Sequence, residues 1–267
     1  MNIDIDPQSL ATLITLSTEQ ARHSESVLAL IPYLDLTSLN PTDSEDTILR
    51  LCQQAQTSYG QVAAICIWPK FVALAADLLK NTAIHIATVC NFPEGSQAPQ
   101  QIYQEIEHAI RAGVHEIDMV IPYQAYVMGN SQAALELVKA AKDLCGQTIC
   151  LKVILETGYW EDTCLLYDAS QAIIAAGADF LKTSTGKIAR GASPEAAWVL
   201  LHAIKANNPQ VGFKAAGGVK DIQSALLYRS IAAQILGSEW VTPQHFRIGA
   251  SQLLTHILEQ AAMSPIS

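Results

Sequence analysis

The stretch AGADFLKTSTGK, residues 176–187, contains a helix end, a turn, an apolar strand and a polar loop in immediate succession. Gly177 is of the residue type that commonly ends a helix, and the run DFLK after it has the apolar character of a buried strand. The phrase AGVHEID, residues 112–118, repeats the same order of features. Two such copies in one chain indicate a fold in which helices and strands alternate.

Short apolar runs of this kind recur along the chain. Their starts lie about 22 to 34 residues apart, which is enough for one strand, one helix and two loops. Several are apolar almost throughout, as expected for strands covered on both faces. The eight runs are YLDLTSL from Tyr33, QVAAICIW from Gln61, IHIATVCNF from Ile84, EIDMVIP from Glu116, TICLKVILE from Thr148, DFLKTSTG from Asp179, VGFKAAGG from Val211 and HFRIGAS from His245.

The segments between these runs have helical spacing and helical end signals. Ser193 and Pro194 supply a cap and a first-turn proline for one helix. Helices expected near 99–112, 131–145 and 162–176 each stop at a glycine. These glycines are Gly113, Gly146 and Gly177.

Eight strands that alternate with helices form either a closed barrel or an open doubly wound sheet. The even strand number and the absence of a G-x-G-x-x-G turn after the first strand favour the barrel. A barrel of this kind needs about 250 residues, and the chain has 267. We therefore predict one α/β domain over residues 1–267, a (β/α)8 TIM barrel. Residues 1–27 are expected to form an additional N-terminal helix that covers one barrel end.

Composition limits the function classes. The net charge of −9 and the lack of a basic stripe argue against nucleic-acid binding. No apolar run approaches the roughly 18 residues of a membrane span, and the acidic start MNIDIDPQ predicts a cytoplasmic protein. The six cysteines form no C-x-x-C pair and are expected to be reduced. The histidines lack metal-binding spacings, so neither a metal nor a cofactor is expected.

Charged residues inside otherwise apolar strands mark the candidate site, because barrel enzymes place their reacting groups at the C-terminal ends of the strands. Structural ion pairing is an alternative for any single one of them. A buried network that only neutralised itself would add little stability, however, so the combination favours a site. The residues are Lys152, Lys182 and Lys214, with the acids Asp35, Asp118 and Glu156.

Two neighbouring lysines suggest a specific chemistry. A second positive charge about 5 Å away costs about 3 kcal/mol at an effective dielectric constant of about 20. Such a neighbour lowers the pKa of a lysine toward neutral pH, and a neutral amine can attack a carbonyl to form an imine. These residues alone do not decide whether Lys182 or Lys214 would be the nucleophile.

The chain closely resembles the deoxyribose-phosphate aldolase family from about Tyr33 to Leu254. The pair formed by KTSTGK and the later FKAAGG turn is the most specific part of the resemblance. The matching stretches are LDLTSLN (34–40), AAICIWP (63–69), IATVCNFPEG (86–95), EIDMVIPY (116–123), LKVILETG (151–158), AGADFLKTSTGK (176–187), GFKAAGGV (212–219) and IGASQLL (248–254).

The resemblance implies a class I aldolase that reversibly cleaves 2-deoxy-D-ribose 5-phosphate into D-glyceraldehyde 3-phosphate and acetaldehyde. It implies that Lys182 forms the Schiff base, that Lys214 is its electrostatic partner, and that Asp118 moves protons through a bound water. Asp35 and Cys66 match positions that line the pocket in the family, although a lone buried cysteine is more often a small core residue. Lys152 would be a supporting cation. In cells, the resemblance implies breakdown or salvage of deoxynucleosides.

Barrels often bind phosphate at the loops after the seventh and eighth strands, on free backbone N–H groups. Here those loops read AAGGVK and RIGAS. Glycine pairs more often mean only a tight turn, but two such loops beside a serine favour phosphate binding. The candidate residues are Thr185, Gly186, Lys187, Gly217, Gly218, Lys220, Gly249, Ala250 and Ser251.

The sequence departs from the family pattern at three points. Ala215 stands where many members have proline, and Gln252 stands where a second serine is common. The end MSPIS lacks the C-terminal tyrosine that some members use in proton transfer at the acetaldehyde methyl group, so that step is expected to be slower.

Three other functions remain as rivals. They are a Schiff-base aldolase for another acceptor aldehyde, a phosphosugar isomerase that uses Asp118 or Glu156 as base, and a non-catalytic phosphate-binding barrel. A homodimer is the default expectation for a soluble enzyme.

Overall fold

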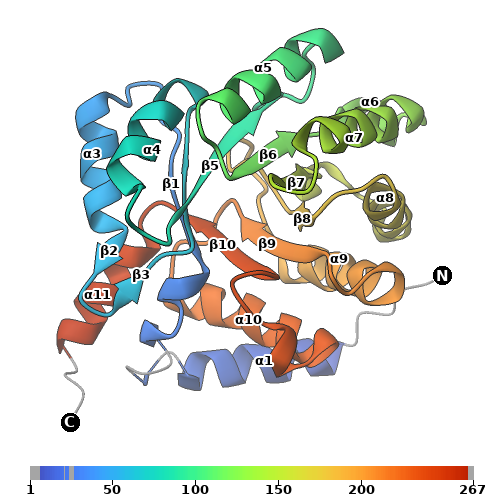
Figure 1. Ribbon diagram of the computed structural model, residues 1–267. Coiled ribbons are helices and arrows are strands. Elements are labelled where there is room, and N and C mark those ends of the chain that lie inside the picture. Colours follow the sequence, from blue (N-terminus) through green and yellow to red (C-terminus); the bar gives the residue numbers. More distant parts are fainter. Residues whose placement is uncertain (1–6, 21, 24–26, 264–267) are drawn as a thin grey trace.

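Eight parallel strands close into a barrel, and helices lie around its outside (Figure 1). The computed structural model describes residues 7–20, 22–23 and 27–263. Around the barrel the strand order is β1, β10, β9, β8, β7, β6, β5 and β4. The predicted (β/α)8 barrel is confirmed, and each predicted apolar run contains one barrel strand. The strands are β1 Leu34–Ser38, β4 Ala64–Ile67, β5 His85–Cys90, β6 Glu116–Val120, β7 Cys150–Ile154, β8 Phe180–Lys182, β9 Gly212–Ala216 and β10 Phe246–Ala250.

The helices of the outer ring begin and end largely at the residues that the sequence indicates. Ser193 accepts a hydrogen bond from the backbone N–H of Ala196, and Pro194 occupies the first turn of that helix. Gly113, Gly146 and Gly177 follow three helix ends with positive φ angles of 93°, 59° and 109°. The helices are α3 Glu45–Gln54, α4 Val72–Leu79, α5 Pro99–Arg111, α6 Tyr123–Val127, α7 Gln132–Cys145, α8 Thr163–Ala175, α9 Pro194–Asn207, α10 Ile222–Leu236 and α11 Leu253–Met263.

A two-stranded hairpin precedes the second barrel strand and was not predicted. It pairs β2 (Gln56–Thr57) with β3 (Gly60–Gln61) in antiparallel orientation. Gly60 has a φ of 129°, which permits the tight turn. The predicted run from Gln61 therefore begins in this hairpin, and only its later part belongs to the barrel.

The N-terminal helix α1 (Pro7–Gln20) packs on the outside of the barrel. It lies along α10 (Figure 1), with Leu13 and Ser17 buried, and Thr18 accepts a hydrogen bond from the Gln223 side chain at 2.6 Å. The expected position across a barrel end is therefore wrong, because the apolar side of α1 covers another helix. Residues 1–6, 21 and 24–26 of the predicted extension lie outside the described residues, as do 264–267 of the MSPIS end.

Charged side chains fill much of the barrel interior. Side chains alternate between the two faces of a strand, and alternate strands contribute to one interior layer. The strand register therefore defines three layers, named here from the N-terminal end of the barrel to its mouth. The bottom layer is Ala64, Glu116, Phe180 and Arg247, the middle layer is Asp35, Ala87, Lys152 and Lys214, and the top layer is Cys66, Asp118, Lys182 and Gly249.

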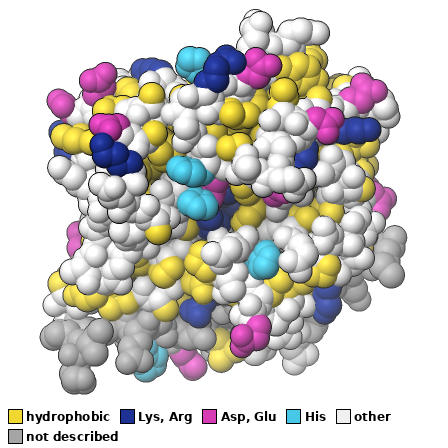
Figure 2. Space-filling model, viewed as in Figure 1, with side chains coloured by type: hydrophobic (Ala, Val, Ile, Leu, Met, Phe, Trp, Pro, Cys, Tyr) yellow, Lys and Arg dark blue, Asp and Glu magenta, His cyan; other side chains and the backbone are white. Residues whose placement is uncertain are grey.

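Histidines lie beside the bottom layer. His85 and His115 stack with ring centroids 5.2 Å apart, and Nδ1 of His85 lies 2.8 Å from Oε1 of Glu116. Figure 2 shows histidine side chains gathered at the middle of the face in view, next to acidic and basic side chains. The ionic interior therefore extends from this end of the barrel to the mouth.

Candidate active site

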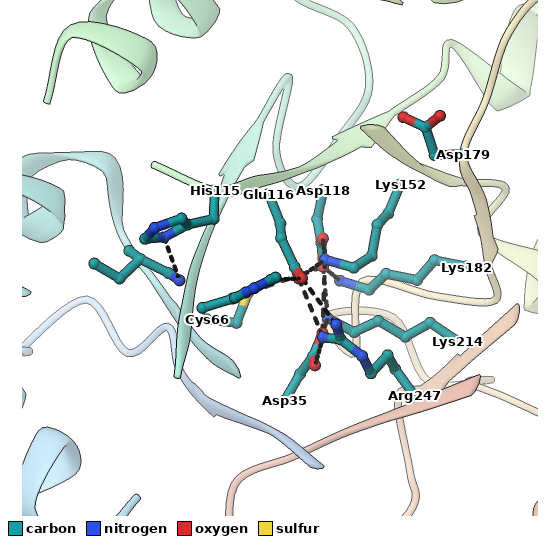
Figure 3. Close-up of polar contacts among 12 residues, drawn as sticks. Asp35, Cys66, His115, Glu116, Asp118, Lys152, Asp179, Lys182, Lys214 and Arg247 are labelled. Atoms are coloured by element: carbon teal, nitrogen blue, oxygen red, sulfur yellow. Dashed lines mark hydrogen bonds and ion pairs between the residues drawn. The ribbon is translucent and has the colours of Figure 1, made fainter. Parts of the chain in front are cut away.

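Three lysines converge on one carboxylate inside the barrel (Figure 3). The Nζ atoms of Lys182 and Lys214 each lie 2.7 Å from Oδ2 of Asp118. The Nζ of Lys152 lies 3.1 Å from Oδ1 of the same residue. Since Lys182 and Lys214 share one oxygen, their nitrogens are less than 5.4 Å apart. Four strands thus bring the predicted lysines and Asp118 into one cluster.

Asp35 and two residues that the sequence reasoning did not select extend this cluster downward. Asp35 accepts from Lys214 at 2.5 Å and from Nη1 of Arg247 at 2.8 Å. Arg247 also donates to Glu116 at 2.9 and 3.3 Å, and Lys152 forms an ion pair with the same carboxylate. Glu116 therefore holds Lys152 from below, and Arg247 holds Asp35, the carboxylate that accepts from Lys214. A signal existed in the sequence, because Arg247 interrupts an apolar run and Glu116 precedes Asp118 by one strand repeat.

Glycine residues make room for this network. A Cβ at Gly249 would lie 3.0 Å from Cε of Lys214 and 3.0 Å from Cβ of Ala216. A Cβ at Gly212 would lie 2.4 Å from the Phe180 ring. Gly249 therefore leaves space for the Lys214 side chain, and its predicted place among the phosphate-binding residues stays a prediction.

Replacing Gly249 with alanine is expected to displace the Lys214 ammonium from Asp35 and Asp118. Overpacking of this kind costs about 1–3 kcal/mol of stability, and kcat for the reaction proposed below should fall by about 10-fold or more. Urea denaturation and steady-state kinetics measure the two effects. An alanine variant with unchanged stability and kcat would contradict the assigned role of Gly249.

The electrostatic environment keeps the carboxylates of the cluster ionised. Burial acts to raise the pKa of Asp118, but Lys152, Lys182 and Lys214 together hold that pKa well below its usual range. The same competition lowers the pKa of Asp35, where Lys214 and Arg247 outweigh burial. It also holds the pKa of Glu116 well below its usual range, through Lys152 and Arg247.

Two of the lysines are correspondingly held in the charged form. Burial acts to lower the pKa of Lys214, but Asp118 and Asp35 outweigh it and raise that pKa. The pKa of Lys152 is raised well above its usual value, because Asp118, Glu116 and Asp35 outweigh burial. The pKa shift expected from the sequence assumes two neighbouring lysines with no anion between them. The structure places an oxygen of Asp118 between them, so that Lys214 is a fixed cation beside Lys182.

Stability should fall in acid because of these carboxylates. A carboxylate whose folded-state pKa is lowered contributes stability above its ordinary pKa, 3.8 for Asp and 4.5 for Glu, and loses that contribution as the pH falls toward the folded-state value. Urea midpoints should therefore be nearly constant from about pH 6 to 8 and decrease steeply below about pH 4.5. Midpoints that stay constant down to pH 3 would show that the cluster is not ionised as described.

Lys182 differs from the other two lysines in position and in exposure. It is the last residue of β8 and belongs to the top layer. Its side chain is 5% exposed, against 1% for Lys214 and 0% for Lys152. Among the described residues it pairs with one carboxylate, whereas Lys214 pairs with two and Lys152 with three. The structure therefore favours Lys182 as the amine that a substrate can reach.

Cys66 lies in the top layer beside Asp118. Its Sγ donates to Oδ2 of Asp118 at 3.9 Å. Burial, and after it the charge of Asp118, raises the pKa of this thiol. The neutral side chain of Cys66 therefore lines the site next to the Asp118 carboxylate.

Glu156 does not join the lysine cluster, although the sequence reasoning grouped it with Asp35 and Asp118. Its backbone has a left-handed φ of 54°, two residues beyond the end of β7. Both carboxylate oxygens accept from the backbone N–H of Thr185 at 3.3 Å, and Oε2 also accepts from the Thr185 hydroxyl at 2.5 Å. The third acid of the cluster is instead Glu116.

Two of the predicted phosphate loops meet at the mouth. Gly186 and Gly217 have φ angles of 76° and 85°, and a Cβ on Gly217 would lie 3.2 Å from the backbone nitrogen of Gly186. Gly218, at φ 86°, has open space where a Cβ would be. The exposed Ser251 follows β10, whose Gly249 pairs with Ala216 of β9, so it lies at the same edge of the barrel.

Lysines next to these loops have different surroundings. The Nζ of Lys187 donates to the backbone carbonyl of Leu39 at 2.7 Å and so bridges the loops after β8 and β1. Lys220 is exposed, and its carbonyl oxygen lies 2.9 Å from Nδ1 of His256. The described residues contain no group of three or more His, Cys, Asp or Glu side chains placed to bind a metal ion. No helix in the described part of the chain is long and apolar enough to cross a membrane.

Comparisons with known proteins agree with this geometry. Residues 29–252 match the model of a family described as DeoC/LacD family aldolase. A deoxyribose-phosphate aldolase of Agrobacterium fabrum is 44% identical over 248 residues, which are 92% of this chain and 96% of that protein.

Solved structures show the same fold. An aldolase designated QR15 is 26% identical, with a TM-score of 0.74 over 89% of this chain and 99% of that chain. A structure described as a tetrameric deoxyribose phosphate aldolase from Aeropyrum pernix is 24% identical, with a TM-score of 0.73 over 95% of this chain and 98% of that chain.

Proposed function

The chain belongs to the DeoC/LacD family of aldolases, and we propose that it reversibly cleaves 2-deoxy-D-ribose 5-phosphate into D-glyceraldehyde 3-phosphate and acetaldehyde. The observation that carries this proposal is the position of Lys182 at the barrel mouth, where it shares one oxygen of Asp118 with Lys214. A reachable amine beside a fixed cation and a carboxylate is what imine chemistry needs.

The charge balance of the cluster supports Lys182 as nucleophile. Lys152, Lys214 and Arg247 face the three carboxylates, so these six charges balance one another without a contribution from Lys182. The basic residues are Lys152, Lys182, Lys214 and Arg247, and the carboxylates are Asp35, Glu116 and Asp118.

In the proposed reaction the amine of Lys182 attacks C1 of the open-chain sugar, and loss of water gives an iminium ion. The C3 hydroxyl then loses its proton, the C2–C3 bond breaks, and its electron pair moves toward the iminium nitrogen to form an enamine. Glyceraldehyde 3-phosphate leaves, C2 takes up a proton, and water releases acetaldehyde from Lys182. Asp118, ionised and 2.7 Å from the lysine nitrogen, would accept and return protons through a water molecule.

The phosphate of the substrate would bind across the loops after β8, β9 and β10. Backbone N–H groups near Gly186, Gly218 and Ser251 can face an anion there, and left-handed glycines allow its close approach. Lys187 and Lys220 would add positive charge. Asp35 and Lys152 act from the middle layer, where they hold Lys214 and Asp118 in place.

An assay of both products tests this function. Wild-type enzyme given 2-deoxyribose 5-phosphate should release acetaldehyde and glyceraldehyde 3-phosphate in equal amounts. A different acceptor aldehyde in the reverse reaction would indicate another Schiff-base aldolase. Conversion of an aldose phosphate to a ketose phosphate without cleavage would indicate an isomerase.

We also propose a cytoplasmic homodimer. No disulfide joins any of the six cysteines, all of which lie in the described chain, as is usual in a reducing compartment. Symmetric dimers are the commonest soluble oligomers. Sedimentation velocity at micromolar concentration distinguishes a dimer from a monomer or a tetramer.

A further inference from the structure

Glu156 occupies an unusual place beside the candidate active site. It follows β7 with φ 54° and ψ 58°, a left-handed conformation that costs about 1–3 kcal/mol for a residue other than glycine. Its residue is 0% exposed, and nothing in the reaction proposed above uses its carboxylate. The strained backbone and the buried carboxylate of Glu156 therefore point to a role outside the proton transfers of that reaction.

The carboxylate of Glu156 binds the loop between Lys182 and the phosphate site. It accepts the Thr185 hydroxyl at 2.5 Å and the Thr185 backbone N–H at 3.3 Å. The hydroxyl of Thr185 in turn accepts from the backbone N–H of Lys187 at 3.0 Å. One side chain thus fixes the backbone from Thr185 to Lys187.

Both ends of this loop carry groups that must be placed accurately. At one end, the carbonyl of Lys182 accepts from the backbone N–H of Leu155, the residue before Glu156, at 3.0 Å. At the other end, Gly186 lies against Gly217 in the candidate phosphate cradle. Residues 155 and 156 therefore hold the amine end and the phosphate end of one loop together.

We propose that Glu156 is a positioning residue that fixes the distance between the Lys182 nitrogen and the phosphate cradle, and thereby makes the enzyme selective for a phosphorylated substrate. This inference rests on the proposed aldolase function. Both oxygens of Glu156 accept from Thr185, so the carboxylate is directed to the loop. Its left-handed backbone is explained as the geometry that directs the carboxylate to the loop.

The electrostatic surroundings agree with this role. Burial raises the pKa of Glu156, and the hydrogen bonds from Thr185 and the charge of Lys182 oppose that rise only in part. Burial therefore disfavours the charge of Glu156, and the hydrogen bonds that join it to the loop favour that charge.

Kinetics with two substrates test the proposal. In Glu156→Ala, kcat/KM for 2-deoxyribose 5-phosphate should fall by about 100-fold, because a loop shift of about 1 Å can cost that much. For 2-deoxyribose without phosphate, kcat/KM should change by less than about 5-fold, since that substrate does not use the cradle. Glu156→Gln keeps a carbonyl oxygen for the Thr185 hydroxyl and should recover most of the loss.

Thr185→Val is the matched variant, and it keeps the test available if Glu156→Ala does not fold. It removes the hydroxyl but leaves the backbone N–H, so it should show the same selectivity with a smaller loss, about 10-fold for the phosphorylated substrate. For the phosphorylated substrate, kcat/KM of the double variant should be no lower than that of Glu156→Ala, because both substitutions break the same contact between Glu156 and Thr185. Equal losses for the two substrates, no loss, or additive losses would each overturn the proposal. Wild-type enzyme inactive on both substrates would instead refute the aldolase function.

Discussion

Replacing Lys182 with methionine is expected to lower kcat for cleavage by at least about 10,000-fold, because the covalent intermediate can no longer form. The fold should survive. Lys152 and Lys214 still pair with Asp118, so the change leaves no buried carboxylate without a cation. A coupled assay for glyceraldehyde 3-phosphate measures the loss, and circular dichroism verifies the fold.

Lys139→Met is the matched control, because Lys139 is an exposed lysine on α7. It should retain the wild-type kcat. Residual activity of Lys182→Met above about 1% of wild type would show that another amine, Lys214 first of all, can carry the reaction.

Replacing Arg247 with methionine is expected to cost about 3–5 kcal/mol of stability, the typical loss when one partner of a buried ion pair is removed. Arg247 donates to Asp35 and Glu116 at the bottom of the cluster, and both carboxylates would stay buried. Without Arg247, Asp35 loses one of the contacts that place it beside Lys214, so kcat should also fall. Urea denaturation at pH 7 measures the stability.

The surface pair between Arg111 and Glu107 provides the comparison. Their charged atoms are 3.5 Å apart and the side chains are 67% and 49% exposed. Arg111→Met should change stability by less than about 1 kcal/mol. Equal effects of the two arginine substitutions would mean that the Arg247 network is not formed in solution.

The barrel could be predicted because its strands are buried on both faces and therefore read as apolar runs. The hairpin of β2 and β3 could not, since strands of two residues leave no periodic pattern. The place of α1 depends on which neighbour has an apolar face free, and α10 supplies that face. Such long-range packing is not encoded in the local sequence.

The sequence indicates most residues of the candidate site, but it does not indicate which role each residue would have. Lys182 and Lys214 look alike in the sequence, and the structure distinguishes them by their height in the barrel, their exposure and the number of carboxylates with which they pair. Glu156 ends the apolar run TICLKVILE, so the sequence groups it with Asp35 and Asp118. The left-handed turn at Glu156 instead directs its carboxylate to Thr185. Arg247 was missed because RIGAS was interpreted as a phosphate-binding loop, whereas Arg247 lies within β10.

Trapping the covalent intermediate tests the central claim most directly. The enzyme is incubated with acetaldehyde and sodium borohydride, which reduces an imine to a stable secondary amine, and the modified peptide is located by mass spectrometry. An ethyl group on Lys182, in wild-type protein and not in Lys182→Met, is the predicted result. An ethyl group on Lys214 would exchange the roles of the two lysines, and an unmodified protein that nevertheless cleaves the sugar phosphate would contradict a Schiff-base mechanism.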